Sequence, residues 1–180
     1  MSSEPRLHLL FGPNRWASET VLEVYAGSSS VAQSGLLPKP AILRLERWLG
    51  AHDLLPDKAA SLEDASWAQQ LGQLVGSLRI FAGLDSPTFD SDSSGACLAL
   101  RCDDHSFTTL CLEAAFALCR AAVSSGSEQA FETVLNEFAQ HALDLGFDPP
   151  AIAVMQAARR LGVPFRRHSI LHAHFVLGEG

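Results

Sequence analysis

Three histidines close to the end of the chain have the residue type and spacing of metal ligands. His172 and His174 are two positions apart, so they would project from the same face of a strand. His168 lies a few residues earlier, on the strand expected to be its neighbour. Imidazole nitrogens bind zinc and nickel, so these three residues are weak candidates for a metal site. The alternative is that they line a strand surface or contact a further domain.

Near the other end, the turn sequence Gly12-Pro13-Asn14 precedes two residues that could bind a ligand. The guanidinium of Arg15 can pair with a carboxylate, and the ring of Trp16 can stack on a ligand. Alternatively, Pro13 and Trp16 fix a structural corner while Asn14 bonds its own turn. Turn chemistry accounts for glycine, proline and asparagine without any ligand, so both interpretations stay open.

Two sets of charged residues could hold a polymer or a partner protein. The arginine cluster is the one basic cluster of the chain and consists of Arg159, Arg160, Arg166 and Arg167. The acidic set lies on one predicted helix and consists of Glu128, Glu132 and Glu137. The first set suits an acidic polymer segment or partner surface, and the second suits an arginine-bearing polymer. The alternative for each is an ordinary solvated surface.

Sequence motifs of known catalytic sites are missing. The chain has no G-x-x-x-x-G-K-[ST], no G-x-G-x-x-G after a strand and no G-x-S-x-G. Its two lysines, Lys39 and Lys58, fall in predicted loops. Asp103-Asp104-His105 is interpreted as a strand-to-helix turn, in which Asp104 or Ser106 caps the next helix. We therefore predict no catalytic residue and no cofactor in this chain.

The four cysteines lack the paired spacing of a structural zinc site. They are Cys97, Cys102, Cys111 and Cys119, and no two of them form a C-x-x-C pair. Cys111 and Cys119 fall in a helical apolar pattern, where cysteine acts as a small hydrophobic residue. We expect all four to be reduced, and metal binding is the alternative.

The composition suits one compact domain. Of the 180 residues, 47% are hydrophobic, which supplies material for a core. The net charge of -7 disfavours nucleic acid and anionic membrane as partners. The apolar residues 7–11 are too few for a signal peptide, and no run reaches transmembrane length. We expect a cytoplasmic protein with no nucleic-acid or membrane partner.

Hydrophobic periodicity and turn signals predict the elements that would position these residues. Strands are predicted at residues 7–11, 20–26, 96–102, 163–168 and 172–177, helices at 41–51, 62–82, 106–123, 128–145 and 151–161, and loops at 27–40 and 85–95. Ser61 is the expected N-cap of the second helix, in which Gly72 and Gly76 indicate close packing against another element. The order predicts an α/β (α+β) class: a small mixed sheet packed with several helices, followed by a C-terminal helix-strand-strand unit.

Three stretches of the chain have counterparts in one known family, in the same order and at similar spacing. The first is Gly12-Pro13-Asn14-Arg15-Trp16, where the family has Gly-Pro-Asn-x-Trp after a first strand. The second is a helix that starts at Trp67 and ends in Phe81-Ala82-Gly83-Leu84-Asp85. The third reads A-A-R-R-L-G-V-P over residues 157–164, followed by a strand that ends in Leu177-Gly178-Glu179-Gly180. Together they make the chain resemble the N-terminal domain of cyanophycin synthetase.

Cyanophycin synthetases build a branched Asp/Arg polymer with an ATP-grasp domain and a Mur-ligase-like domain, both preceded by an N-terminal domain. The resemblance implies that residues 1–147 form the cyanophycin-synthetase N-terminal-like domain. Residues 148–180 would be a short helix/strand segment leading towards an ATP-grasp domain that is absent here. The chain is then either a domain of a longer protein or a stand-alone form. The family's His-x-x-Glu-His-like helix pattern is replaced by A-Q-Q-L-G-Q-L over residues 68–74, so the polymer's identity is not carried over.

We therefore expect a non-catalytic polymer- or substrate-binding or docking domain of a cyanophycin-synthetase-like ATP-dependent amide ligase. Binding would fall to Arg15, Trp16, the arginine cluster and Glu132. The expected partners are a peptide-like polymer of the Asp/Arg type, an ATP-grasp/Mur-ligase-like domain or subunit, and a second copy of the chain. One alternative is an oligomerisation module that binds no substrate, with contacts from the Gly72/Gly76 helix face and the helix over residues 107–123. The other is a small metal-dependent enzyme that uses the C-terminal histidines.

Overall fold

The computed structural model describes most of the chain. The described residues are 6–18, 20–26, 36–55, 61–84, 89–102, 104–163, 165–167 and 175–178. At positions 149, 159, 165–167 and 175–177 the backbone alone is described.

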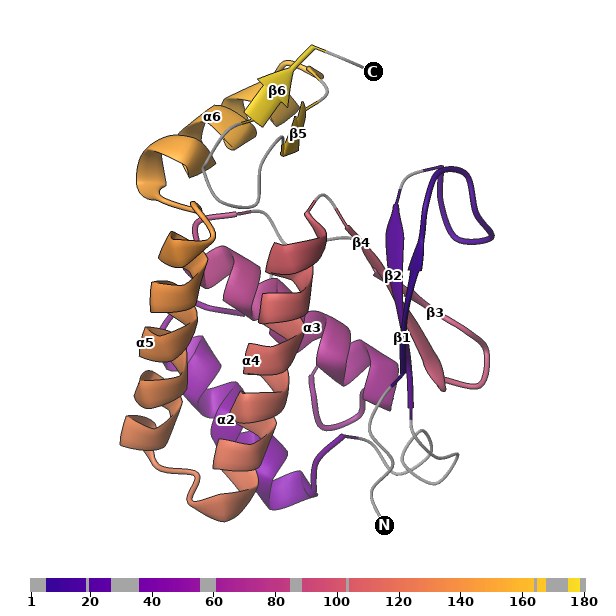
Figure 1. Ribbon diagram of the computed structural model, residues 1–180. Helices are drawn as coiled ribbons and strands as arrows, with labels where there is room; N and C mark the ends of the chain where they lie inside the picture. The colour runs from indigo at the N-terminus through magenta and orange to yellow at the C-terminus, as the bar shows by residue number, and fades with distance from the viewer. Residues whose placement is uncertain are drawn as a thin grey trace.

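A four-stranded sheet forms one side of the molecule (Figure 1). Its strands are β1 (Arg6–Leu10), β2 (Val21–Tyr25), β3 (Phe89–Ser91) and β4 (Cys97–Arg101), in the spatial order β1-β2-β4-β3. All three pairings are antiparallel, so the sheet is antiparallel where a mixed one is predicted. In antiparallel pairs, directly opposed residues point to the same face, so the register assigns each strand residue to a face of the sheet.

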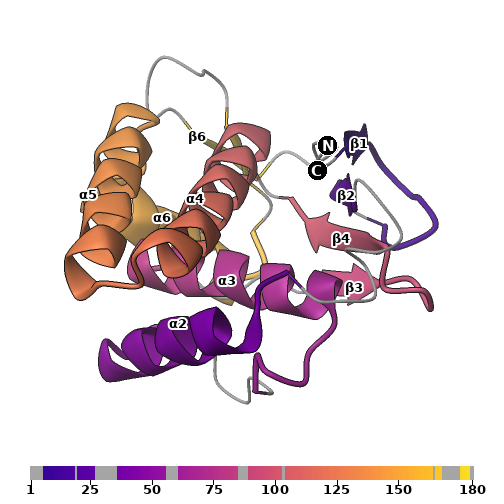
Figure 2. The ribbon, with the colours of Figure 1, turned by 90° about the horizontal axis from the view of Figure 1, so that it is seen from below.

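The helices gather on one side of this sheet (Figures 1 and 2). They are α2 (Lys39–Ala51), α3 (Trp67–Phe81), α4 (His105–Ser124), α5 (Glu128–Asp144) and α6 (Pro149–Arg160). α3 packs against β3 and β4, and α4 packs against α2, α3 and α5. The predicted α/β class is therefore confirmed, and each predicted helix is present with its ends shifted by a few residues.

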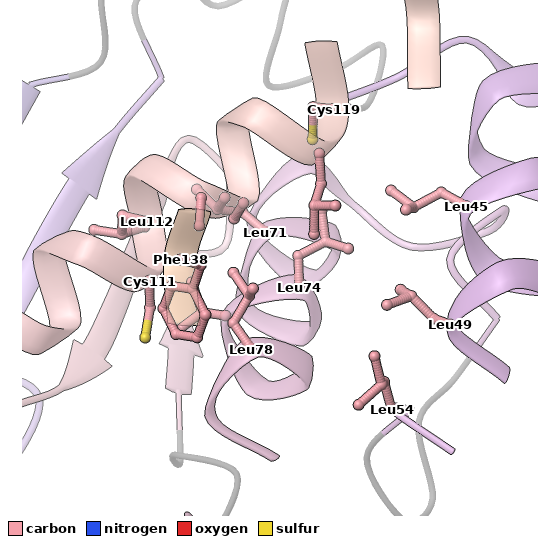
Figure 3. Close-up of a cluster of buried hydrophobic side chains, with 14 of the residues drawn as sticks. Leu45, Leu49, Leu54, Leu71, Leu74, Leu78, Cys111, Leu112, Cys119 and Phe138 are labelled. Carbon is pink, nitrogen blue, oxygen red and sulfur yellow. The ribbon is translucent and has the colours of Figure 1, made fainter. Parts of the chain in front are cut away.

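The core lies between the sheet and the helical layer. Leu22, Val24, Leu98 and Leu100 face it from the sheet, and leucines of α2 and α3 meet cysteines of α4 and Phe138 of α5 (Figure 3). α3 is buried on all sides, because every residue from Trp67 to Arg79 except Gln69 is buried. This burial explains the apolar content of the helix and its two glycines.

Two local predictions were wrong. The N-cap of α3 is Ser66 rather than Ser61: Ser66 Oγ accepts from the Gln69 N–H at 3.3 Å, and the Ser66 N–H donates to Gln69 Oε1 at 2.8 Å. Ser61 instead precedes a turn, where its hydroxyl accepts from the Glu63 N–H. The reciprocal pair at Ser66 satisfies two backbone N–H donors at once, which favours that start.

The second wrong prediction is the loop at residues 85–95, because β3 lies within it. β3 pairs with β4, with Phe89 opposite Leu100. The Phe89 ring packs on Gly72, where an added Cβ would lie 2.7 Å from ring atoms. The predicted close approach at Gly72 is thus confirmed, and the packing of the partly buried Phe89 ring stabilises a strand in a mostly polar segment.

The C-terminal helix-strand-strand unit is also present. It consists of α6 and a separate two-stranded antiparallel sheet of β5 (Phe165–Arg167) and β6 (Phe175–Leu177). α6 buries Ala151, Met155 and Ala158, and Gln156 donates a hydrogen bond to the carbonyl of Gly83. The unit is therefore attached to the end of α3.

Of the helices in the described residues, α4 alone is long and apolar enough to cross a membrane. Half of its most apolar stretch is buried inside the protein. Residues such as Phe107, Cys111 and Leu118 lie in the core among α2, α3 and α5. α4 thus forms part of the core of this fold.

Candidate functional site

Glu23 is a charged residue buried in the middle of β2. Its exposed fraction is 3%, and it points away from the helices, since Leu22 and Val24 face the core. Across the sheet it opposes His8 on β1 and Ala99 on β4. A buried carboxylate requires partners, because leaving one unpaired is costly.

The turn after β1 supplies those partners. Asn14 Oδ1 accepts hydrogen bonds from the Trp16 N–H at 2.9 Å and the Ala17 N–H at 3.1 Å. The Asn14 side-chain amide donates to the carbonyl of Gly12 at 3.0 Å, and Gly12 adopts a φ of 61° that favours glycine. The interpretation of Asn14 as a residue that bonds its own turn is confirmed.

This turn brings Arg15 and Trp16 to Glu23. Glu23 Oε1 accepts from Arg15 Nε at 2.9 Å, from Arg15 Nη2 at 2.6 Å and from Trp16 Nε1 at 2.6 Å. Arg15 Nη2 also donates to the Tyr25 hydroxyl at 2.7 Å, and that hydroxyl donates to Glu23 Oε2 at 3.0 Å. The guanidinium carbon lies 5.0 Å from the centre of the Trp16 ring. We call Arg15, Trp16, Glu23 and Tyr25 the Glu23 cluster.

Charge and hydrogen bonding fix the protonation states of the Glu23 cluster. Burial favours a higher pKa for Glu23, but hydrogen bonds from Trp16, Arg15 and Tyr25 and the charge of Arg15 bring that pKa below its ordinary value. The hydrogen bond to Glu23 raises the pKa of Arg15. Burial, then the hydrogen bond to Glu23, raises the pKa of Tyr25. At neutral pH the cluster therefore holds a carboxylate, a guanidinium and a neutral phenol.

The geometry of the Glu23 cluster is suited to orienting the side chains of Arg15 and Trp16 and not to acid–base catalysis. A general base needs a free lone pair beside the reacting group. The Glu23 carboxylate already accepts four hydrogen bonds, about as many as its oxygens offer. Cys97, opposite Tyr25 in the sheet, has a pKa raised by burial and stays a thiol. The Glu23 cluster thus orients Arg15 and Trp16 at the surface.

The arginine cluster is described in part. Arg160 is exposed at the end of α6. Arg159 lies in α6, and Arg166 and Arg167 lie in β5, but the side chains of these three lie outside the described residues. The histidines of the candidate metal site, His168, His172 and His174, also lie outside them.

The acidic set does not form one face of α5. Glu128, Glu132 and Glu137 are all exposed. At about 100° per residue, however, Glu137 is rotated by roughly 140° from Glu132 around the helix axis. Glu128 lies 3.8 Å from the Nε2 atom of His52, which packs on Trp48. Glu132 and Glu137 therefore lie on different sides of α5 and could not both bind one ligand.

Cys111 and Cys119 lie in the core, as predicted, and Cys102 lies there too. All four are free and buried. Burial raises the pKa of both Cys111 and Cys119 to about 12, so these thiols are poor nucleophiles and poor metal ligands. Within the part of the chain that the structure describes, no three His, Cys, Asp or Glu side chains gather as metal ligands would.

Glu23 and Tyr25 are the site residues that the sequence did not indicate. Their alternation with Leu22 and Val24 does place them together on the polar face of a strand. Such an alternation usually indicates that the polar residues are exposed to solvent. In the structure, however, the turn that contains Arg15 covers Glu23 and buries it. Asp104, one of the two predicted caps of α4, is its N-cap, because its Oδ1 accepts from the Phe107 N–H at 2.8 Å.

The chain matches no protein-family model, and no curated protein is significantly similar to it.

Proposed function

We propose that this chain is a non-catalytic binding or docking domain of a cyanophycin-synthetase-like ATP-dependent amide ligase in the cytoplasm. One observation carries the proposal: the Glu23 cluster holds Arg15 and Trp16, both from the stretch that resembles the family's Gly-Pro-Asn-x-Trp motif. A buried carboxylate used to orient a surface cation and an aromatic ring is an arrangement suited to recognition.

In this proposal the chemistry belongs to an ATP-grasp or Mur-ligase-like domain or subunit. The domain holds a growing peptide-like chain, or the ligase itself, so that the reacting end stays at high effective concentration. Amide-bond formation then needs no nucleophile or nucleotide site in this chain. Three stretches of the chain resemble the N-terminal domain of cyanophycin synthetase in the same order, which supports binding in this chain and catalysis in another domain or subunit.

Calorimetric titration of the purified chain with a short Asp/Arg segment, at low and at moderate salt, tests the proposal. We expect saturable binding that weakens as salt rises, because charged groups on both partners are involved. Arg160→Ala and Glu132→Ala change one exposed residue of each charged set, and they show which set takes part. No binding at either salt concentration would contradict the polymer-binding function.

The oligomerisation alternative keeps only part of the surface that was expected. The Gly72/Gly76 face of α3 is buried inside the domain and cannot supply contacts between copies. α4 buries 9 of its 20 residues, and Val123 near its end is 56% exposed, so α4 can still supply contacts. Phe11 and Leu161 expose 76% and 77% of their surface and are further candidates. Light scattering of the protein and of Phe11→Ser tests this alternative, since a monomer in both cases would contradict it.

A further inference from the structure

The two edges of the four-stranded sheet differ in their protection against pairing with another strand. β3 is three residues long, includes the exposed Asp90 and is followed directly by Asp92. β1 is five residues long, and no acidic residue or proline occurs between Arg6 and Phe11. Folded proteins usually prevent pairing at an edge by short strands, charges or proline. The edge at β3 has such protection, whereas the residues of β1 after Arg6 lack it.

The backbone of β1 has unused hydrogen-bonding groups at its outer edge. Where β2 pairs with β4, the Cys102 N–H donates to the opposite Thr20 carbonyl at 2.9 Å. Because hydrogen-bonded pairs alternate along an antiparallel ladder, the even-numbered residues of β2 bond to β4 and the odd-numbered ones bond to β1. The register then leaves Leu7 and Leu9 with N–H and C=O groups that point away from β2. Within the described residues these outward groups have no partner.

The side chains of the same two residues are apolar and incompletely covered. Leu7 opposes Val24 and Leu9 opposes Leu22, so both point to the helix side of the sheet. Val24 and Leu22 are buried, but Leu7 is 43% exposed and Leu9 is partly buried. β1 lies at the end of the sheet farthest from α2 and α3 (Figure 2). Phe11, the next residue on this side, is 76% exposed. We call Leu7, Leu9 and Phe11 the β1 strip.

A second copy of the chain fits this edge, because the β1 strip is complementary to itself. Consider an antiparallel pair of β1 strands related by a two-fold axis at Leu9. Leu7 of each copy then lies opposite Phe11 of the other, and the residues with outward backbone groups face one another. Their hydrogen bonds are satisfied in both directions, and the exposed apolar side chains of the edge cover each other.

Charge also favours a second copy at this edge. Each chain has a net charge of -7, which opposes association over much of the surface. The β1 strip is uncharged, and Arg6 of one copy lies opposite Gly12 of the other in this register, so like charges are not opposed. Pairing of two β3 edges would instead bring Asp90 and Asp92 of both copies together. Two copies can therefore approach at β1 with little repulsion.

We propose that two copies of this chain associate through antiparallel pairing of their β1 strands, which joins the two four-stranded sheets into one continuous sheet. Both helical layers then lie on the same side of that sheet, and the two β1 strips pack against each other on that side. The inference goes beyond the proposed function and does not depend on it, because the pairing uses neither the arginine cluster nor the Glu23 cluster.

Sedimentation equilibrium over a wide range of protein concentrations tests the proposal. A pair of short strands is smaller than a standard interface of about 1,200–2,000 Å², so we expect weak association, with an average mass that rises with concentration towards that of two chains. Because salt screens the repulsion between two acidic chains, the association should strengthen as salt rises. Binding of an Asp/Arg segment is expected to weaken as salt rises, so the two results are distinguishable. A protein that stays monomeric at every concentration would overturn the proposal and leave the edge to a strand of another protein.

Substitutions at Leu7 test the place of the contact. Leu7→Pro removes an outward N–H and no bond to β2, and proline is tolerated in an edge strand at such a position. We expect it to weaken association by at least about tenfold. Leu7→Lys places a charge at the same exposed position and should act similarly, so the test stands even if Leu7→Pro is poorly folded. Leu161→Lys is the matched control, because Leu161 is 77% exposed and lies directly after α6. Association that both Leu7 variants retain, or that Leu161→Lys abolishes, would contradict pairing at β1.

A single cysteine tests the position of the two-fold axis. Opposed residues of a hydrogen-bonded pair have Cα atoms about 5.5 Å apart, which is within the range of a disulfide. Under mild oxidation Leu9→Cys should therefore form a covalent dimer. The unaltered protein should not, because its four cysteines are buried. Leu161→Cys is the control for chance collisions, and equal cross-linking of Leu9→Cys and Leu161→Cys would show that the β1 strands do not pair.

Discussion

The indole N–H of Trp16 donates a 2.6 Å hydrogen bond to Glu23 Oε1, the oxygen that also accepts from the Arg15 guanidinium. A turn outside the sheet thus depends on a single carboxylate within it. Glu23 contributes one oxygen to three donors, and a neutral amide in its place could not accept all of them.

Glu23→Gln should lower the free energy of unfolding by about 1–3 kcal/mol, because donors of Arg15 and Trp16 lose their acceptor in a buried place. Urea denaturation followed by tryptophan fluorescence measures this change. Asp90→Asn is the matched control, since Asp90 is exposed on the same face of the sheet and should change stability by no more than about 0.5 kcal/mol. Equal effects of the two substitutions would show that the Glu23 cluster adds nothing to stability.

The contribution of Glu23 should depend on pH. The folded-state pKa of Glu23 lies below its ordinary value of 4.5, so the unfolded chain takes up this proton first as the pH falls. The stabilisation is complete above that ordinary value and is lost as the pH falls through the folded-state pKa. The difference in unfolding free energy between the unaltered protein and Glu23→Gln should therefore be constant near neutral pH and shrink as the pH falls below 4.5. A difference that stays the same over this range would show that Glu23 is not held ionised by its partners.

The helices and the main strands could be predicted because their apolar periodicity is long and regular. α4 and α5 begin and end within a residue or two of the prediction, and the Asp104 cap follows from local chemistry alone. β3 could not be predicted in this way. Three residues are too few to show a period, and Phe89 has a reason to form a strand only when Gly72 is beside it in space.

The Glu23 cluster could likewise be predicted only in part from the sequence. The sequence indicates that Arg15 can pair with a carboxylate and that Asn14 forms a turn. Which carboxylate meets Arg15 depends on where the turn folds, and Glu23 is eight residues away on a strand whose pattern indicates exposure. The predicted N-cap of α3 was wrong for a different reason. The sequence Ser66-x-x-Gln69 is itself a capping-box pattern, and Ser66 exchanges hydrogen bonds with Gln69, so this start could have been predicted from local chemistry.

Gly72→Ala should lower the free energy of unfolding by about 1–3 kcal/mol, because its Cβ would overlap the Phe89 ring at 2.7 Å. Gly50→Ala is the matched control in α2, where the nearest atom to an added Cβ is 3.5 Å away. Alanine favours helix over glycine, so Gly50→Ala should raise stability by up to about 1 kcal/mol. Thermal denaturation of both variants measures the contrast.

A second substitution tests the cause of the Gly72 effect. Combining Gly72→Ala with Phe89→Leu should cost less than the sum of the two single changes, because the smaller side chain leaves room for the added methyl group. Strict additivity would show that the loss in Gly72→Ala does not come from its contact with Phe89.

Two serines of α3 should respond in opposite ways to replacement by alanine. Ser66 accepts from the Gln69 N–H and closes the capping box, so Ser66→Ala should cost about 0.5–2 kcal/mol. Ser77 is 1% exposed, and its hydroxyl has no hydrogen-bond partner within the described residues. Removing an unsatisfied buried hydroxyl relieves a desolvation penalty, so Ser77→Ala should be neutral or stabilising. Urea denaturation of the two variants measures both changes, and a loss at Ser77 as large as that at Ser66 would show that the hydroxyl is satisfied, as by a buried water.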